Sequence, residues 1–134
     1  MDLYQETLLD HYRNPRNVGK LDNPDFSSGE DNPSCGDSVI MEGHIKNNIL
    51  TDIHFTGKGC VLSQAAASML TESCQGKTIE EILALNKDFV LTLIGMKLGP
   101  NRLRCALLPL EALQKGIKMY KDKQQRKGTE KKGA

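Results

Sequence analysis

A thiol and a carboxylate lie two residues apart in the stretch 31–37, which reads Asp-Asn-Pro-Ser-Cys-Gly-Asp. Pro33 stiffens the chain before Cys35, and Gly36 allows the backbone to bend sharply between Cys35 and Asp37. A carboxylate by itself raises the pKa of a neighbouring thiol, so a cation between the two groups explains the pairing better. We therefore predict that this loop supplies two ligands to a metal or iron–sulfur site.

Two further cysteines lie in contexts that favour a reactive thiolate. Cys60 is expected at or just before a helix N-terminus, where the helix dipole lowers the pKa of a thiol. Cys105 follows Arg102 and Arg104, whose charges act in the same direction. Three thiolates and a carboxylate form an acceptable tetrahedral set for zinc, and three thiolates with one oxygen can hold a labile [2Fe–2S] cluster. The candidate ligands are Cys35, Asp37, Cys60 and Cys105.

The same three cysteines could instead be small buried hydrophobic residues. Gaps of 25 and 45 residues separate Cys35, Cys60 and Cys105, and these match no compact zinc-finger pattern, so spacing alone leaves both interpretations open. Cys74 is a different case. It follows Cys60 by 14 residues on what we expect to be one helix, which separates the two by about 21 Å at 1.5 Å per residue. We therefore interpret Cys74 as structural.

The three histidines compete with the thiols as candidate metal ligands. His11 lies in the first expected helix, whereas His44 and His54 lie on the expected strands. None of them has a second ligand three or four residues further along the chain. We therefore expect all three histidines at the surface and outside the metal site.

The composition is typical of a single globular domain. The 134 residues are 38% hydrophobic and 26% charged, and no apolar stretch approaches the roughly 20 residues that span a bilayer. The first six residues have neither the basic nor the apolar segment of a signal peptide, so we expect a cytoplasmic protein. In that compartment thiols stay reduced, and four cysteines therefore indicate metal binding or thiol chemistry rather than disulfides.

The net charge of +1 is unevenly distributed along the chain. Seven Lys or Arg and two acidic residues fall within 118–134, which makes this end basic and leaves the remainder acidic. A basic tail can contact nucleic acid or membranes, but three Tyr, three Phe and no Trp offer few rings for base stacking. We expect one domain over 1–120, a flexible solvated tail over 121–134, and neither nucleic acid nor membrane as a partner.

The elements that must position these residues indicate an α+β fold. Alternating apolar residues predict strands over 38–45 and 49–56, joined by a short turn into an antiparallel hairpin with one buried face. Residues 15–34 are rich in Pro, Asn, Asp, Gly and Ser, and predict loop with one short strand before Cys35. A small antiparallel sheet packed by four or five helices results.

Helical periodicity and capping motifs define the expected helices. A first helix should end near Asn14, and a second, over 62–74, carries a run of small residues that allows close packing. A last helix is expected over 103–121. It must either begin at Pro109 or kink there, because proline cannot donate a hydrogen bond to the carbonyl of Cys105. The expected helix caps are Asp2 with Gln5, Thr78 with Glu81, and Asn86.

Four motifs occur in a characteristic order. They are His-Tyr-Arg-Asn-Pro-Arg-Asn-Val-Gly at 11–19, Asn-Pro-Ser-Cys-Gly-Asp at 32–37, Gly-Lys-Gly-Cys at 57–60 followed by the small residues 65–68, and Arg-Cys-Ala-Leu-Leu at 104–108 leading to Glu-Ala-Leu at 111–113. In this order they resemble the iron–sulfur cluster scaffold family of IscU, SufU and the N-terminal domain of NifU. The resemblance covers residues 1 to about 120.

This resemblance implies a compact α+β domain whose three cysteines cluster at one exposed end. A cysteine desulfurase would deliver persulfide sulfur there, and iron and electron donors would complete a transient [2Fe–2S] cluster for transfer to apo client proteins. Cys35, Cys60 and Cys105 are implied as ligands or sulfur acceptors, with Cys105 as the principal acceptor. Asp37 is implied as the exchangeable fourth ligand that keeps the cluster labile. The implied role is that of a scaffold rather than an enzyme.

Two positions depart from the IscU pattern. IscU members have a His directly before the third cysteine, where this chain has Arg104, and arginine can act there only as a modulating charge. They also carry Leu-Pro-Pro-Val-Lys for recognition by a chaperone, where residues 98–102 read Leu-Gly-Pro-Asn-Arg. We therefore do not expect chaperone-dependent release. A basic residue before the third cysteine resembles SufU, although the SufU insertion of about twenty residues between the second and third cysteines is absent.

Three functions are compatible with this mixture of features. The first is a scaffold that assembles and transfers a [2Fe–2S] cluster. The second is a SufU-like zinc-bound relay that passes persulfide sulfur to a separate scaffold. The third is a small interaction module in which zinc only stabilises the fold. Chain length favours the first and Arg104 the second, whereas the placement of Asp37 beside Cys35 argues against the third.

Overall fold

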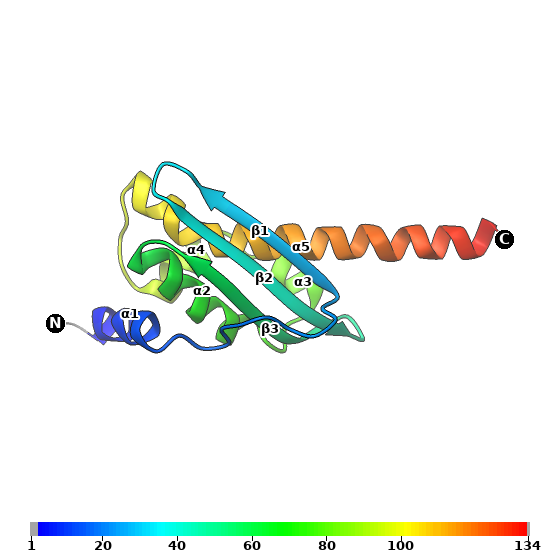
Figure 1. The fold of residues 1–134 in the computed structure, drawn as a ribbon, viewed down its shortest axis with the longest axis horizontal. Helices are drawn as coiled ribbons and strands as arrows, with labels where there is room; N and C mark the ends of the chain where they lie inside the picture. Colours follow the sequence, from blue (N-terminus) through cyan, green and yellow to red (C-terminus); the bar gives the residue numbers. More distant parts are fainter. Residues whose placement is uncertain (1–2, 134) are drawn as a thin grey trace.

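A computed structural model describes the backbone of residues 3–133 and the side chains of residues 5–126. In this part of the chain, a three-stranded antiparallel sheet in the order β1-β2-β3 packs against helices (Figure 1). The strands are β1 (Phe26–Asn32), β2 (Asp37–Lys46) and β3 (Ile49–Lys58). The helices are α1 (Leu3–Arg13), α2 (Val61–Cys74), α3 (Ile79–Leu83), α4 (Lys87–Ile94) and α5 (Pro100–Gly133). The predicted α+β architecture is confirmed.

The sheet contains the predicted hairpin and the predicted short third strand. Along β2, buried Val39 and Met41 alternate with exposed Ile40, and the pairing of β2 with β3 shifts between His44 and Ile45. Strand β1 pairs with β2 through a register that places Asn32 opposite Asp37. The four residues between these two strands therefore form a tight turn at the end of the sheet, and this turn carries Cys35.

Small side chains allow the helices to approach one another and the sheet closely. The predicted small-residue run 65–68 of α2 is fully or almost fully buried, and α2 contacts both α1 and α5. Phe26 lies against Gly43 and Gly116, where an added Cβ would come within 2.6 and 2.5 Å of the ring. Helix α5 thereby packs tightly along the sheet, which fixes the position of Cys105 relative to the turn before β2.

Several predicted caps are present. Thr78 and Glu81 form a reciprocal capping box on α3, and the Asn86 side chain accepts hydrogen bonds from the first turn of α4. The proposed cap at Asp2 lies outside the described residues. Among the described helices, none is both long enough and apolar enough to cross a membrane.

The last helix differs from the sequence-based expectation at both ends. It begins at Pro100, where proline suits the first helical position, and Pro109 lies inside it rather than at its start. It continues to Gly133 instead of ending near Lys121, and its last turns project beyond the sheet (Figure 1). Residues 121–133 therefore extend the helix, because a polar, solvated sequence without Pro can continue a helix that is already formed. The flexibility of this tail stays a prediction.

Candidate sulfur and metal centre

The turn between β1 and β2 presents Cys35 at the surface. The N–H groups of Cys35 and Gly36 donate to the Asn32 carbonyl at 3.1 and 2.9 Å, and Gly36 has a φ of 73°. This left-handed conformation favours glycine and gives the turn its sharp bend. The Asn32 side-chain amide also donates toward the Cys35 sulfur, with Nδ2 3.6 Å from Sγ. The turn therefore holds an exposed thiol next to a polar donor.

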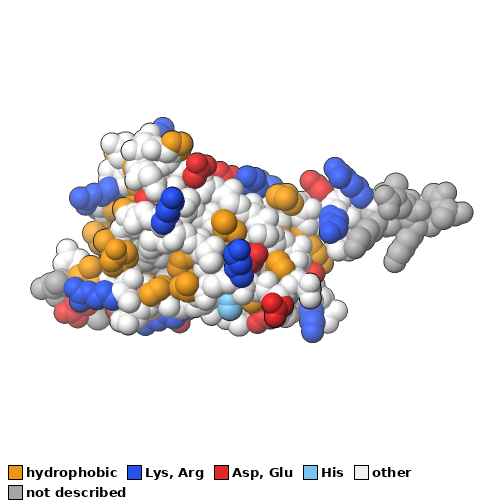
Figure 2. Space-filling view, in the orientation of Figure 1, with side chains coloured by type: hydrophobic (Ala, Val, Ile, Leu, Met, Phe, Trp, Pro, Cys, Tyr) orange, Lys and Arg blue, Asp and Glu red, His pale blue; other side chains and the backbone are white. Residues whose placement is uncertain are grey.

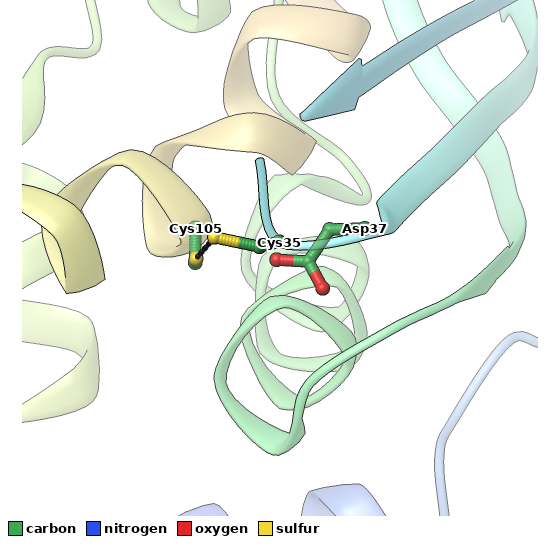
Figure 3. A group of neighbouring side chains, drawn as sticks. All are labelled: Cys35, Asp37 and Cys105. Atoms are coloured by element: carbon green, nitrogen blue, oxygen red, sulfur yellow. Dashed lines mark hydrogen bonds between the residues drawn. The ribbon is translucent and has the colours of Figure 1, made fainter. Parts of the chain in front are cut away.

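Helix α5 brings Cys105 to this turn. The Cys105 thiol is only 6% exposed, and it donates to the Cys35 sulfur across an Sγ–Sγ distance of 3.5 Å (Figure 3). Ligand atoms of Cys35, Asp37 and Cys105 all lie within 4.8 Å of one another. Three residues from two distant parts of the chain therefore form a group that could hold one metal ion.

Asp37 links Cys60 to this group. The Asp37 carboxylate is almost completely buried, at 1% exposure, and its Oδ1 accepts the Cys60 N–H at 2.7 Å. Its Oδ2 accepts from the Cys60 thiol at 3.4 Å. Cys60 is the N-cap of α2, as predicted, and its sulfur accepts the Ser63 N–H at 3.4 Å. All four predicted ligands are thus in one connected cluster, although Cys60 lies outside the tight group of three.

Gly59 makes the contact between Asp37 and Cys60 sterically feasible. Its φ is 136°, and a Cβ at this position would lie 2.1 Å from Asp37 Oδ1. Neither Gly59 nor Asn32 was assigned a role from the sequence. The signal for Gly59 was its position directly before a candidate ligand, and the signal for Asn32 was its place at the start of the turn motif.

The electrostatics of Cys105 differ from the expectation. Burial, followed by its hydrogen bonds to Asp37 and Cys35, raises the pKa of the Cys105 thiol well above its ordinary value. The net shift of the Cys105 pKa is therefore opposite to the lowering that the neighbouring arginines predicted. Arg104 is exposed, so water screens its charge, whereas desolvation acts directly on the sulfur. The modulating role of Arg104 in sulfur transfer stays a prediction.

A cavity with a volume of about 430 Å³ opens beside the three thiols. Its walls are mainly apolar, and Asn101 and Arg102 add polar groups at the start of α5. Figure 2 shows apolar side chains gathered at this end of the molecule, where α1 and the loop before α5 lie. The apolar lining is formed by Leu8, Val61, Leu62, Met96 and Leu98. Reactants can therefore reach the thiols through a partly shielded space.

His11 is not at the surface, contrary to the expectation. Only 7% of it is exposed, its Nδ1 lies 2.7 Å from Ser68 Oγ, and its Nε2 lies 3.3 Å from a Glu72 carboxylate oxygen. It is buried because the small residues of α2 let α1 approach closely. His44 binds Asp52 and the Asp22 carbonyl.

Cys74 lies in the core of the protein, apart from the metal group. It is completely buried in α2, and burial raises its pKa to about 12. A thiol in this environment is protonated and inaccessible, which agrees with a structural role.

The comparisons with known proteins agree with this geometry. The model of the NifU-like N-terminal domain matches residues 3–127. A zinc-dependent sulfurtransferase SufU of Bacillus subtilis (strain 168) is 36% identical over 132 residues, covering 86% of this chain and 89% of that protein. The iron–sulfur cluster assembly scaffold protein IscU of Escherichia coli (strain K12) is 37% identical over 130 residues, covering 92% of this chain and 98% of that protein.

Solved structures extend this similarity to the fold. The crystal structure of a protein described only as hypothetical has a TM-score of 0.77 and 30% identity, covering 87% of this chain and 97% of that one. The N-terminal part of a NifU-like protein from Brucella abortus has a TM-score of 0.75 at 22% identity, covering 90% and 96% of the two chains. With its fold, its thiol cluster and a family match over 3–127, this chain belongs to the NifU-like N-terminal domain family.

Proposed function

We propose that the protein accepts sulfur from a cysteine desulfurase and transiently holds a [2Fe–2S] cluster as cargo for delivery to apoproteins. The observation that carries this proposal is the convergence of three thiols and one buried carboxylate at one end of the fold. The names of the relatives, which include both scaffolds and a sulfurtransferase, support the same role. The implied partners are a desulfurase, donors of iron and electrons, and client proteins.

The four side chains contribute differently to such a site. Cys35 is exposed on its turn, so an approaching sulfur donor can reach its thiol. Cys105 is buried behind it at the edge of the cavity, where a bound sulfur atom would be partly shielded from water. Asp37 offers a hard oxygen ligand to a soft iron–sulfur cluster. It is therefore the most weakly bound of the four ligands and the one from which release would begin. Cys60 completes the donor set from the N-terminus of α2.

A second candidate function is a zinc-bound sulfur relay. Three thiolates and one carboxylate suit tetrahedral zinc, and the basic residue before Cys105 resembles the sulfurtransferase branch. In this alternative the metal holds the thiols in position, and persulfide passes on without cluster assembly. A zinc-stabilised interaction module is less well supported, because a purely structural site has no need of an exposed ligand beside an open cavity.

Anaerobic reconstitution distinguishes these functions. We expect that iron, cysteine, a cysteine desulfurase and a reductant produce a visible absorption spectrum typical of a [2Fe–2S] cluster, which an apo-ferredoxin then acquires. Cys35→Ser and Cys105→Ser should abolish the spectrum, whereas Cys74→Ala should retain it, because Cys74 lies in the core. A protein that takes up persulfide and zinc stoichiometrically, but never forms a transferable cluster, would overturn the scaffold proposal in favour of the relay.

A further inference from the structure

The contact between Cys35 and Cys105 has a consequence beyond ligand binding. Their sulfurs lie 3.5 Å apart (Figure 3), and a disulfide bond is about 2.0 Å long, so a small movement would bring the two sulfurs to bonding distance. Cys60 is arranged differently, because its thiol donates to Asp37 and its sulfur accepts from Ser63. The site therefore contains a pair of cysteines close enough to form a disulfide when an oxidant such as a persulfide is supplied, and a third cysteine that is held apart.

The two paired cysteines differ in their surroundings in a way that suggests distinct roles. Cys105 is buried and borders the cavity of about 430 Å³, so a sulfur atom added to it has space beside it. Cys35 is exposed, and the Asn32 amide N–H points at its sulfur from 3.6 Å. A polar donor of this kind stabilises negative charge on sulfur. Cys105 thus fits the carrier of a persulfide, and Cys35 fits the attacking nucleophile.

We propose that the Cys35–Cys105 pair releases sulfide from a persulfide by an internal disulfide exchange. The inference rests on the proposed function, in that Cys105 must first accept a sulfur atom. The Cys35 sulfur then attacks Sγ of the Cys105 persulfide, a bond forms between the two Sγ atoms, and the bond between Sγ and the terminal sulfur of the persulfide breaks. The terminal sulfur leaves as hydrosulfide into the adjoining cavity.

The step is balanced without any further reactant. One of the two groups, the Cys35 thiol or the persulfide, is ionised and the other carries a proton. That proton leaves with the terminal sulfur as part of the hydrosulfide. The terminal sulfur gains two electrons, and the two Sγ atoms together lose two as they form the disulfide. A dithiol then returns the pair to the reduced state by thiol–disulfide exchange. The protein itself thereby supplies the first two electrons that turn persulfide sulfur into the sulfide of a cluster.

The test uses the full chain, stripped of metal and handled anaerobically. The protein is loaded with glutathione persulfide, freed of small molecules, and incubated without reductant. We expect about one hydrosulfide per chain that accepted sulfur, and a disulfide between Cys35 and Cys105. Trypsin makes this linkage easy to recognise, since Cys35 falls in peptide 21–46 and Cys105 in 105–115, while Cys60 and Cys74 share peptide 59–77. The joined peptides should separate again after treatment with dithiothreitol.

Four variants test which thiol attacks the persulfide. Cys35→Ser should keep a stable persulfide on Cys105 and release at least tenfold less sulfide than the parent. Cys105→Ser should form no cross-link. Cys74→Ala should release sulfide as the parent does, because Cys74 lies in the core and is not part of the sulfur–sulfur contact. Asn32→Ala should slow release several-fold without changing the amount of sulfur accepted, since it removes only the donor to Cys35.

The outcomes separate this inference from the proposed function. One outcome would overturn the exchange alone: Cys35→Ser carries a persulfide on Cys105, and the parent either keeps the same persulfide or moves its outer sulfur to Cys35 without releasing sulfide. Sulfur acceptance by Cys105 would still stand in that case. Equal sulfide release from the parent and Cys35→Ser would also overturn the exchange. If no persulfide forms on Cys105 in any variant, even with a cysteine desulfurase as donor, then sulfur acceptance fails and the inference fails with it.

Discussion

Asp37 combines two roles at the scale of a single residue. Its buried carboxylate hydrogen-bonds to the backbone and thiol of Cys60, and one of its oxygens lies within 4.8 Å of the Cys35 and Cys105 sulfurs. A carboxylate with 1% exposure is costly to bury unless it is hydrogen-bonded or paired with a cation. The hydrogen bonds from Cys60 meet part of this requirement, and a metal ion would meet the rest.

Replacing Asp37 by Ala should slow the loss of a reconstituted cluster rather than prevent its binding. The reason is that a hard oxygen ligand is the most readily exchanged member of an otherwise thiolate set. The measurement is the decay of visible absorption in the presence of a chelator. Asp37→Asn serves as the control, because it keeps an oxygen acceptor for the Cys60 N–H without the charge. Faster decay in Asp37→Ala would make Asp37 an anchor and not an exit point.

Gly59 should tolerate no side chain. Gly59→Ala places a Cβ where Asp37 Oδ1 now lies, at a φ of 136° that non-glycine residues rarely adopt. We expect a loss of about 1–3 kcal/mol in unfolding free energy, as is usual for strained backbone positions, together with weaker zinc binding. Urea unfolding and competition with a chromophoric chelator measure the two effects. Gly99→Ala is the matched control, since its Cβ would meet nothing within 4 Å; equal losses in both variants would contradict this explanation.

At the scale of elements, α1 is attached to α2 through a buried histidine. Ser68 accepts the Arg16 N–H at 2.9 Å and also contacts His11, so one hydroxyl holds both the end of α1 and the segment after it. Leu8 of the same helix forms one wall of the cavity beside the thiols. The attachment of α1 therefore determines part of the surroundings of the site.

The stability of this attachment should depend on pH. Burial, and then the charge of Arg16, lowers the pKa of His11 below its ordinary value. His11 therefore binds a proton more readily in the unfolded protein than in the folded one. Its contribution to folding stability is complete above the unfolded pKa of about 6.5 and is lost as the pH falls through the pKa of the folded protein. Urea unfolding between pH 8 and pH 5 should show this loss in the parent and much less of it in His11→Gln.

His44 provides a control, because its effect on folding stability changes with pH in the opposite direction. Hydrogen bonds to the Asp22 carbonyl and then to Asp52 raise its pKa, so it contributes stability at low pH that disappears as the pH rises. His44→Gln should therefore reduce stability at pH 5 and leave it unchanged at pH 8. An unaltered pH profile in His11→Gln would show that His11 does not sense protons in the folded protein.

At the scale of the whole molecule, the site lies at one end and the projecting part of α5 lies at the other (Figure 1). The last core contacts of this helix are made by Ile117 and Tyr120, and the described side chains from Asp122 to Arg126 are exposed. The described side chains of residues 122–126 therefore contribute little to the core that supports the thiols.

A chain ending at Tyr120 should keep the fold and the site. We expect its unfolding free energy to stay within about 0.5 kcal/mol of the parent, which is typical of changes at exposed positions, and its zinc affinity to be unchanged. Urea unfolding and zinc titration provide the measurements. A chain ending at Gln114 is the control, since it removes buried Ile117 and should unfold. A large loss of stability in the first truncation would show that 121–134 belongs to the domain.

The sequence by itself determined the local features of this protein. Alternation along β2 and β3, the capping box at Thr78 and the cap at Asn86 depend on neighbouring residues, so they could be predicted from short stretches. The motifs around Cys35, Cys60 and Cys105 likewise identified the candidate ligands and the family. Of the two alternatives that the sequence left at Pro109, a start of the helix is excluded because Pro109 lies inside α5, and the penalty of an internal proline is outweighed once the helix packs along the sheet.

Only the tertiary structure decided how these residues meet. Cys35 and Cys105 are 70 positions apart, and their contact depends on how α5 packs against β1 and β2. The burial of His11 depends on the close approach of two helices, and the raised pKa of Cys105 depends on desolvation and on neighbours from two other elements. Desolvation and contact distance belong to the packed molecule, and a sequence pattern does not contain them. For that reason the sequence identified the candidate ligands, and the fold determined which of their side chains lie in contact.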